Sequence, residues 1–290
     1  MMTELLPKNR FAMVLTCTQG LLEQANSLFN GLEIYGNTVD VHLLSKDINK
    51  DYLDRLPDNF YVPDWKTHVV DLNKPKHKGG GWEVRYYRYK HVREIKDFYD
   101  AVMIIDADVF LIGNLMEHFE RAFTEGCLIM PNNPRGVALD RANLDNVNGA
   151  SSPPYHCHPF FFDPKKYDFL MADVYKYGLE EDFGDMATLY RTLFRHDIHK
   201  TVVTIPNDLY CFTDWHFDKM EKTFDENNKM VLTYKGNRVI VVHRRWNMPA
   251  VREKFVHDLK GKHIEFGTHN VEIFKEAIDW LNATGSLKWN

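Results

Sequence analysis

The chain has 290 residues, of which 44% are hydrophobic and 27% charged, a balance typical of a globular protein rather than a disordered one. Its 36 basic and 41 acidic side chains give a net charge of −5, which does not favour a general nucleic-acid or membrane-surface binder. No apolar run approaches the roughly 18 residues of a membrane span, and Met1–Arg10 lacks the pattern of a signal peptide, so we expect neither.

The first half of the chain alternates apolar strands with amphipathic helices. Strands are expected at 11–16, 39–44, 68–70 and 102–105, and helices at 21–32 and 83–97. Gly36-Asn37 follows the first helix and is a typical helix end. Strands that alternate with helices imply right-handed crossovers, so the fold class is α/β with a mostly parallel sheet.

The second half is less regular. Residues 132–154 are rich in Asn, Pro, Gly and Ser and are expected to form loops, whereas strands are expected at 160–162, 201–205 and 239–242 and helices at 183–194 and 271–281. No linker divides the sequence, which predicts a single domain over 1–290. The four cysteines are too unevenly spaced for a disulfide framework, so reduced thiols and a cytoplasmic location are expected.

Two carboxylates end the apolar run Val102–Ile105, namely Asp106 and Asp108. The carboxyl end of a strand is where ligands bind in an open α/β sheet. Side chains one residue apart point to opposite faces of a strand, so these two can converge only if the strand ends or bends there. Two anions at a buried strand end call for a compensating cation, and a hard divalent metal suits their oxygen atoms. An ordinary Asp-rich turn is the alternative.

A histidine ends a second apolar strand late in the chain. His243 follows Val239–Val242 and precedes the basic pair Arg244-Arg245. A lone histidine after a strand is usually structural. Two Asp and one His would, however, form a borderline-hard site suited to Mn²⁺ or Mg²⁺.

Candidate phosphate contacts lie in two places. Thr16 and Thr18 sit in a loop between the first strand and the first helix, where hydroxyls and backbone N–H groups suit a nucleotide. Arg85 and Arg88 are three residues apart and share a face of the second helix. A plain turn and a solvated helix face are the alternatives for the two pairs.

These residues together resemble the GT-A glycosyltransferases, closest to the family-8 group of glycogenin-like and galactosyltransferase-like enzymes. The run Tyr99–Asp108 is similar to the strand with that family's Asp-x-Asp signature, and Val242-His243 with Asn247-Met248-Pro249 resembles its late His–Pro segment. Asp185-Met186 is similar to its Asp-Gln segment near the acceptor. The segment His156–Pro159 stands where the family shows an Asn-Ser-Gly-like turn.

The resemblance implies a GT-A Rossmann-like mixed, mostly parallel sheet flanked by helices. It implies a nucleotide-sugar-binding half at 1–130 and an acceptor-binding half at 131–290. The expected activity is that of a hexosyl- or pentosyltransferase that uses a nucleoside-diphosphate sugar and Mn²⁺ or Mg²⁺. Arg85 and Arg88 would then contact the phosphates or the sugar.

The same resemblance implies roles for the other site residues. Asp108 and His243 would bind the metal, and Asp106 would bind the metal, the donor ribose or both. An inverting enzyme would need a carboxylate base, for which Asp182 and Asp185 are the candidates, whereas a retaining enzyme would need none. Helix capping is the alternative role for Asp182.

Two other functions stay open at this point. One is a phosphatase or phosphotransferase with Asp106 as its nucleophile, and the other is a non-catalytic nucleotide-sugar-binding protein. The acceptor of a transferase would be a glycan, a protein, a lipid head group or a modified nucleobase. Basic residues between Lys74 and Arg93 would suit DNA, which the net charge does not favour.

Overall fold

The computed structural model describes residues 7–18, 21–45, 48–63, 82–133, 155–181, 185–212, 219–227 and 229–243. The strand expected at 68–70, the helix expected at 271–281 and most of the loop expected at 132–154 lie outside these residues. The same is true of Asp182 and of the segment after His243.

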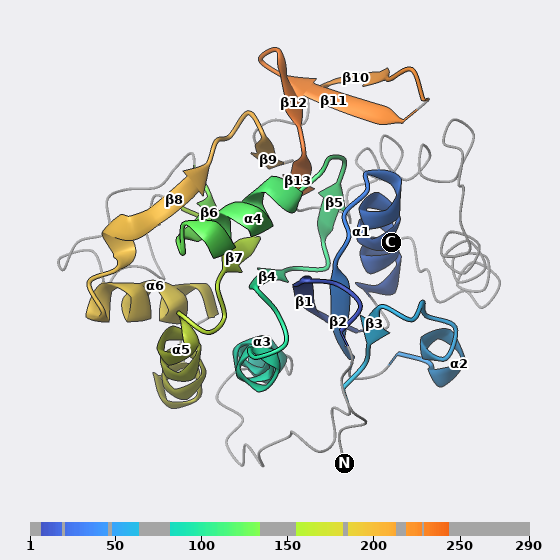
Figure 1. The fold of residues 1–290 in the computed structure, drawn as a ribbon. Helices are drawn as coiled ribbons and strands as arrows, with labels where there is room; N and C mark the ends of the chain where they lie inside the picture. The colour runs from blue at the N-terminus through green and yellow to red at the C-terminus, as the bar shows by residue number, and fades with distance from the viewer. Residues whose placement is uncertain are drawn as a thin grey trace.

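A seven-stranded sheet forms the centre of the protein, in the order β3-β2-β1-β4-β7-β6-β8 (Figure 1). Its members in chain order are β1 (Phe11–Cys17), β2 (Asp40–Ser45), β3 (Phe60–Tyr61), β4 (Ala101–Ile105), β6 (Leu128–Pro131), β7 (Phe160–Phe162) and β8 (Val202–Ile205). Strand β1 is parallel to both β2 and β4, and β7 is antiparallel to both of its neighbours. The carboxyl ends of β1, β2 and β4 therefore share one edge of the sheet.

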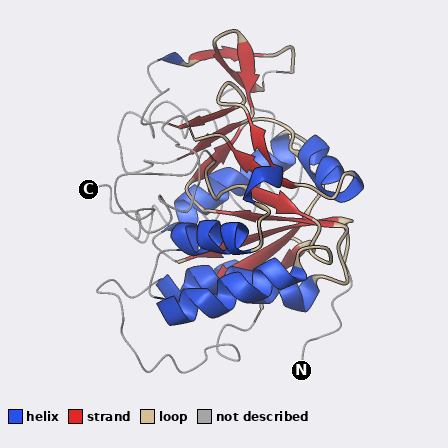
Figure 2. Cartoon of the chain, turned by 90° about the vertical axis from the view of Figure 1, so that its left-hand side faces the viewer, coloured by secondary structure: helices blue, strands red, loops and turns tan. Residues whose placement is uncertain are grey.

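Helices cover both faces of this sheet (Figure 2). Helices α1 (Leu22–Ile34) and α4 (Met116–Thr124) pack on one face, and α3 (Trp82–Ile95), α5 (Asp168–Glu181) and α6 (Asp185–Arg195) on the other. Short α2 (Lys50–Leu53) precedes β3, and a 3₁₀ turn at His199–Thr201 precedes β8. Met13 of β1 belongs to the core beneath α1 and α4, whereas its neighbour Val14 belongs to the core beneath α3. Burial on both faces explains the continuous apolar run in β1.

Two small sheets extend this framework. One has the order β5-β13-β9 and consists of β5 (Val109–Leu111), β13 (Val241–His243) and β9 (Tyr210–Phe212). The other, at the top of Figure 1, has the order β10-β11-β12 and consists of β10 (Glu221–Phe224), β11 (Met230–Tyr234) and β12 (Asn237–Val239). Only Ile240 separates β12 from β13, so the chain passes directly from one small sheet to the other.

The α/β class and the mostly parallel sheet are confirmed. Helix α1 ends where expected, because Gly36 takes a φ of +68°, which favours glycine. The single strand expected at 239–242 is wrong: the run is divided at Ile240 between β12 and β13. Helix α5 was not expected, because exposed Phe169 blurs the helical spacing of its buried residues.

Within the described residues, no helix has both the length and the apolar character needed to cross a membrane. All four cysteines are free thiols, and Cys17, Cys157 and Cys211 are buried.

Candidate functional site

Asp106 and Asp108 lie at the carboxyl end of β4, in the centre of the main sheet. The strand ends at Ile105, and the chain turns through Asp106, Ala107 and Asp108 before β5 begins. This turn interrupts the alternation of an extended strand, so the two carboxylates can approach a common point. Their side chains are 34% and 35% exposed, which leaves both open to a solute.

Strand pairing brings His243 to these carboxylates. Strand β13 runs antiparallel to β5, and His243 lies opposite Val109, the residue after Asp108. The Nε2 atom of His243 is 3.1 Å from Oδ1 of Asp108 and 3.9 Å from Oδ2 of Asp106. Ligand atoms of the three residues all lie within 4.8 Å of one another. In the part of the chain that the structure describes, this is the only such group of potential metal ligands.

Tyr210 determines which nitrogen of His243 carries a proton in the neutral ring. The buried Tyr210 hydroxyl is 2.9 Å from the backbone oxygen of His158 and 2.6 Å from Nδ1 of His243. A carbonyl oxygen can only accept, so the hydroxyl donates its single proton to His158 and accepts one from Nδ1. In that neutral tautomer Nε2, 3.1 Å from Oδ1 of Asp108, offers a lone pair to a cation, whereas the doubly protonated ring donates from Nε2 to Asp108. An imidazole nitrogen with a lone pair and a carboxylate oxygen 3.1 Å apart can together bind a cation.

Arg88 is wholly buried and joins two carboxylates. Its Nη1 donates to Oδ1 of Asp106 at 2.7 Å and to the backbone oxygen of Ile105 at 3.1 Å. Its Nη2 donates to Oδ2 of Asp185 at 2.7 Å and lies 3.0 Å from Nε2 of His158, which is itself 3.4 Å from that carboxylate oxygen. Burial by itself would lower the pKa of Arg88, but Asp106 and Asp185 outweigh burial and raise that pKa.

The same contacts keep both carboxylates ionised. Burial alone would raise the pKa of Asp106, but His158, Arg88 and His243 hold it well below its ordinary value. At Asp185, His158 and Arg88 likewise outweigh burial and lower the pKa to about 2. A carboxylate with so low a pKa is a weak proton acceptor near neutral pH, which weighs against the general-base role expected for Asp185.

The remaining candidates border this network. Arg85 is one turn before Arg88 on α3; its side chain is 48% exposed, and its Nη1 is 3.6 Å from Oδ1 of Asp185. Leu15 of β1 pairs with Ile105, the last residue of β4, and Thr16 and Thr18 lie at and just beyond the carboxyl end of β1. Both threonines are half-buried.

Sequence reasoning missed His158 and Tyr210. His158 has a 1% exposed side chain whose Nε2 is 3.4 Å from Asp185 and 3.9 Å from Asp106. The departure of His156–Pro159 from the family pattern was a signal for His158, because unusual residues stood just before a buried strand. Tyr210 offered no such signal, since it lies in a short strand that the apolar pattern did not predict.

No protein-family model matches the sequence, and no curated protein does. Several solved structures share the fold. The galactosyltransferase LgtC, solved with donor and acceptor sugar analogues, has a TM-score of 0.54 and 12% identity, over 91% of this chain and 99% of LgtC. GlyE of Streptococcus pneumoniae has a TM-score of 0.55 and 14% identity, over 96% of this chain and 64% of GlyE. The bifunctional glycosyltransferase WbbM has a TM-score of 0.52 and 14% identity, over 93% of this chain.

This chain spans 52% of WbbM and 64% of GlyE, which are longer proteins. At these identities the likeness establishes the fold alone. The chain therefore has the GT-A fold that its sequence resembles, and its likeness to the family-8 group is a likeness of fold.

Proposed function

We propose that the protein is a metal-dependent glycosyltransferase that moves a sugar from a nucleoside-diphosphate sugar to an acceptor. The observation that carries the proposal is the cluster of Asp106, Asp108 and His243 at the carboxyl edge of the central sheet. Two half-buried carboxylates beside a buried imidazole on a GT-A fold suit a cation that binds the diphosphate of a donor. The cytoplasmic location stays a prediction from the cysteines.

The donor atoms of the cluster fit Mn²⁺ or Mg²⁺, because carboxylate oxygens and a neutral imidazole nitrogen suit these borderline and hard cations. Asp108 and His243 would hold the ion, and Asp106 would share it or bind the donor ribose. When bound, the cation would neutralise the charge that grows on the departing nucleoside diphosphate. Tyr210 would act as a positioning residue that keeps Nε2 of His243 unprotonated.

The donor would lie against the half formed by residues 1–130. Thr16 and Thr18 offer hydroxyls at the carboxyl end of β1, the strand beside β4, and the half-exposed guanidinium of Arg85 can turn toward phosphates. Arg88 is already engaged by Asp106 and Asp185, so we assign it a positioning role rather than the phosphate contact expected from the sequence.

The acceptor would lie against the half formed by residues 131–290, and a glycan, a protein and a modified nucleobase all remain candidates, DNA included. Asp185 would act through Arg88 rather than as a base. Asp182 stays a candidate base from the sequence alone. The likeness of fold to glycosyltransferases favours transfer over the phosphatase with Asp106 as nucleophile.

Metal-dependent donor hydrolysis tests the proposal without knowledge of the acceptor. We expect the protein to release nucleoside diphosphate from at least one of a panel of UDP- and GDP-sugars with Mn²⁺, and to lose this activity in chelator. Asp108→Ala and His243→Ala should abolish release while the circular dichroism spectrum is unchanged. Asp54→Ala is the matched control, because Asp54 is an exposed carboxylate at the end of α2 that lies outside the cluster.

Release that persists in Asp108→Ala at the wild-type rate would refute the metal assignment. Hydrolysis of p-nitrophenyl phosphate that is lost in Asp106→Asn would instead support the phosphatase alternative.

A further inference from the structure

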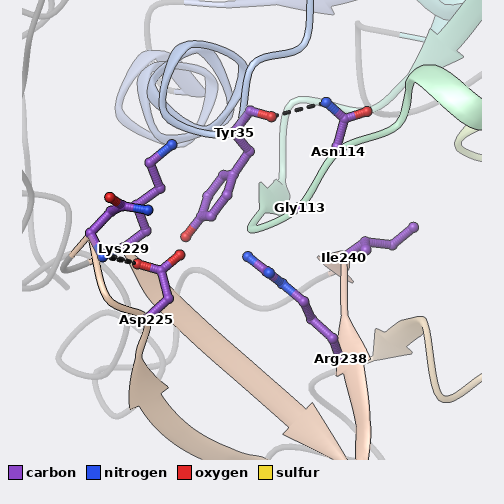
Figure 3. A pocket seen from close by; sticks show the side chains of 8 residues that line it. Tyr35, Gly113, Asn114, Asp225, Lys229, Arg238 and Ile240 are labelled. Carbon is purple, nitrogen blue, oxygen red and sulfur yellow. Dashed lines mark hydrogen bonds between the residues drawn. The ribbon is translucent and has the colours of Figure 1, made fainter.

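A cavity of about 420 Å³ lies where the β10-β11-β12 sheet meets the main body (Figure 3). Tyr35 and Asn114 line it from the ends of α1 and β5. Asp225, Asn227 and Lys229 line it from the turn between β10 and β11, and Arg238 from β12. Its volume is within the ~300–1,000 Å³ range of small-molecule sites.

The walls of this cavity are held by their own hydrogen bonds. The Tyr35 hydroxyl donates to the backbone oxygen of Met230 at 2.7 Å. The Asn114 amide donates to the backbone oxygens of Tyr35 and Gly36 at 3.0 and 3.1 Å. Oδ1 of Asp225 accepts from the backbone N–H groups of Asn227 and Lys229, each at 2.9 Å. The walls formed by Tyr35, Asn114 and Asp225 are therefore preformed, and a ligand would have to order only the long side chains of Arg238 and Lys229.

The charged groups that line the cavity do not form ion pairs with one another. Neither Arg238 nor the Lys229 ammonium has an ion pair or a side-chain hydrogen bond within the described residues, and the second oxygen of Asp225 has no partner there. Figure 3 shows the Arg238 guanidinium and the Asp225 carboxylate both directed into the space below the Tyr35 ring. Unpaired donors and an unpaired acceptor that share one cavity are available to a ligand.

These groups indicate the chemistry of the ligand. Two cations and one anion leave a net charge of +1, which matches a ligand with a single negative charge. A carboxylate carries one charge and can accept two parallel N–H bonds from the Arg238 guanidinium, whereas a phosphate monoester carries nearly two charges, more than the site would neutralise. Sugar hydroxyls both donate and accept, so they can bridge Asp225 to Arg238 and to the Asn227 amide. We infer that this cavity binds a monosaccharide unit that bears one carboxylate.

The cavity is separate from the metal-ligand cluster. Asp108 and His243 lie at one end of the paired strands β5 and β13. At the other end, the cavity residue Gly113 follows β5 and the cavity residue Ile240 precedes β13. At ~3.3 Å per residue, these strands keep the two places roughly 10 Å or more apart. Saccharide binding here does not depend on the proposed transferase activity.

Calorimetric titration of the full chain tests the inference, with D-glucuronate as the probe. We expect glucuronate to bind with a dissociation constant in the millimolar range, and D-glucose and acetate to bind at least ~10-fold more weakly, because each lacks one half of the recognised chemistry. D-Glucose 1-phosphate should also bind more weakly. Absence of glucuronate binding, or tighter binding of either neutral glucose or the phosphate, would overturn the inference.

Variants assign the binding to this cavity. Arg238→Gln and Lys229→Gln should each weaken glucuronate by at least ~10-fold. Lys235→Gln removes the same charge from the same small sheet but does not line the cavity, so it should change affinity by less than about two-fold. An equal loss of glucuronate affinity in Lys235→Gln would mean that glucuronate is attracted by the overall charge of the sheet and does not bind in this cavity.

Asp108→Ala separates this inference from the proposed function. It should remove Mn²⁺ binding and leave glucuronate binding intact. Loss of both would assign the saccharide to the metal cluster and overturn the inference, whatever the enzyme's activity.

Discussion

Arg88 and Asp185 form a buried ion pair, with Nη2 and Oδ2 2.7 Å apart. The other terminal nitrogen of the same guanidinium holds Asp106 at the same distance. The start of α6 is thereby tied to the end of β4 through a single side chain. This tie connects a residue of the proposed acceptor half to a carboxylate of the candidate metal cluster.

Arg88→Ala should lower the free energy of unfolding by roughly 3–5 kcal/mol, because Asp106 and Asp185 would lose their shared buried cation. Urea unfolding followed by circular dichroism measures this change. Arg85→Ala is the matched control on the same helix. Its half-exposed side chain should contribute less than about 1 kcal/mol, and equal losses in the two variants would contradict the prediction.

Asp185→Asn should weaken both turnover and Mn²⁺–nucleotide binding. The amide keeps the shape of the side chain but removes the charge that orients Arg88 toward Asp106. We expect each quantity to fall at least ~10-fold, as for other residues that orient a metal ligand. Donor hydrolysis and calorimetry measure the two. Transfer that drops by ~10²-fold or more with unaltered Mn²⁺–nucleotide affinity would instead restore the general-base role.

Tyr210→Phe should reduce Mn²⁺ affinity by ~10–100-fold, because Nδ1 of His243 would lose the acceptor that keeps its proton there. Titration of free Mn²⁺ by electron paramagnetic resonance measures affinity without any need for activity. Tyr99→Phe serves as the control, since Tyr99 is another buried tyrosine and its hydroxyl bonds to Asp40 and His42 at the opposite end of β4. The tautomer argument fails if the two variants bind Mn²⁺ equally well.

Because His42 is buried, we expect part of the free energy of unfolding to be lost in acid. Burial, and then the neighbouring His91, hold the pKa of His42 well below its ordinary value. An unfolded imidazole protonates near pH ~6.5 whereas the folded one does not, so unfolding takes up a proton below that pH. The stabilisation is complete above pH ~6.5 and is lost as the pH falls toward the folded-state pKa, by up to ~1.4 kcal/mol per pH unit.

His42→Gln removes this titration, so its unfolding free energy should depend less steeply on pH than that of the wild type between about pH 8 and 5. Urea unfolding at several pH values compares the two slopes. Parallel slopes would show that His42 is not the group responsible.

The sequence pattern located Asp106, Asp108 and His243 because each residue ends or closely follows an apolar strand that is buried over its length. Local spacing carries that information, and the parallel order of β1, β2 and β4 follows from the alternation of strands and helices. The true partners of Arg88 were beyond such reasoning. They come from three separate segments of the chain, and α3 shows no local sign that one of its arginines is wholly buried.

Ile240 alone joins β12 to β13, and this restricts where the chain can change length during evolution. Side chains alternate in direction along a strand, so one inserted or deleted residue between Val239 and His243 would turn the imidazole to the opposite face. The turn at Lys235 and Gly236, with φ of +53° and +80°, lies outside that stretch. A residue inserted in this turn would not change the face to which His243 points. Insertions in related sequences should therefore collect at this turn and avoid the connection through Ile240.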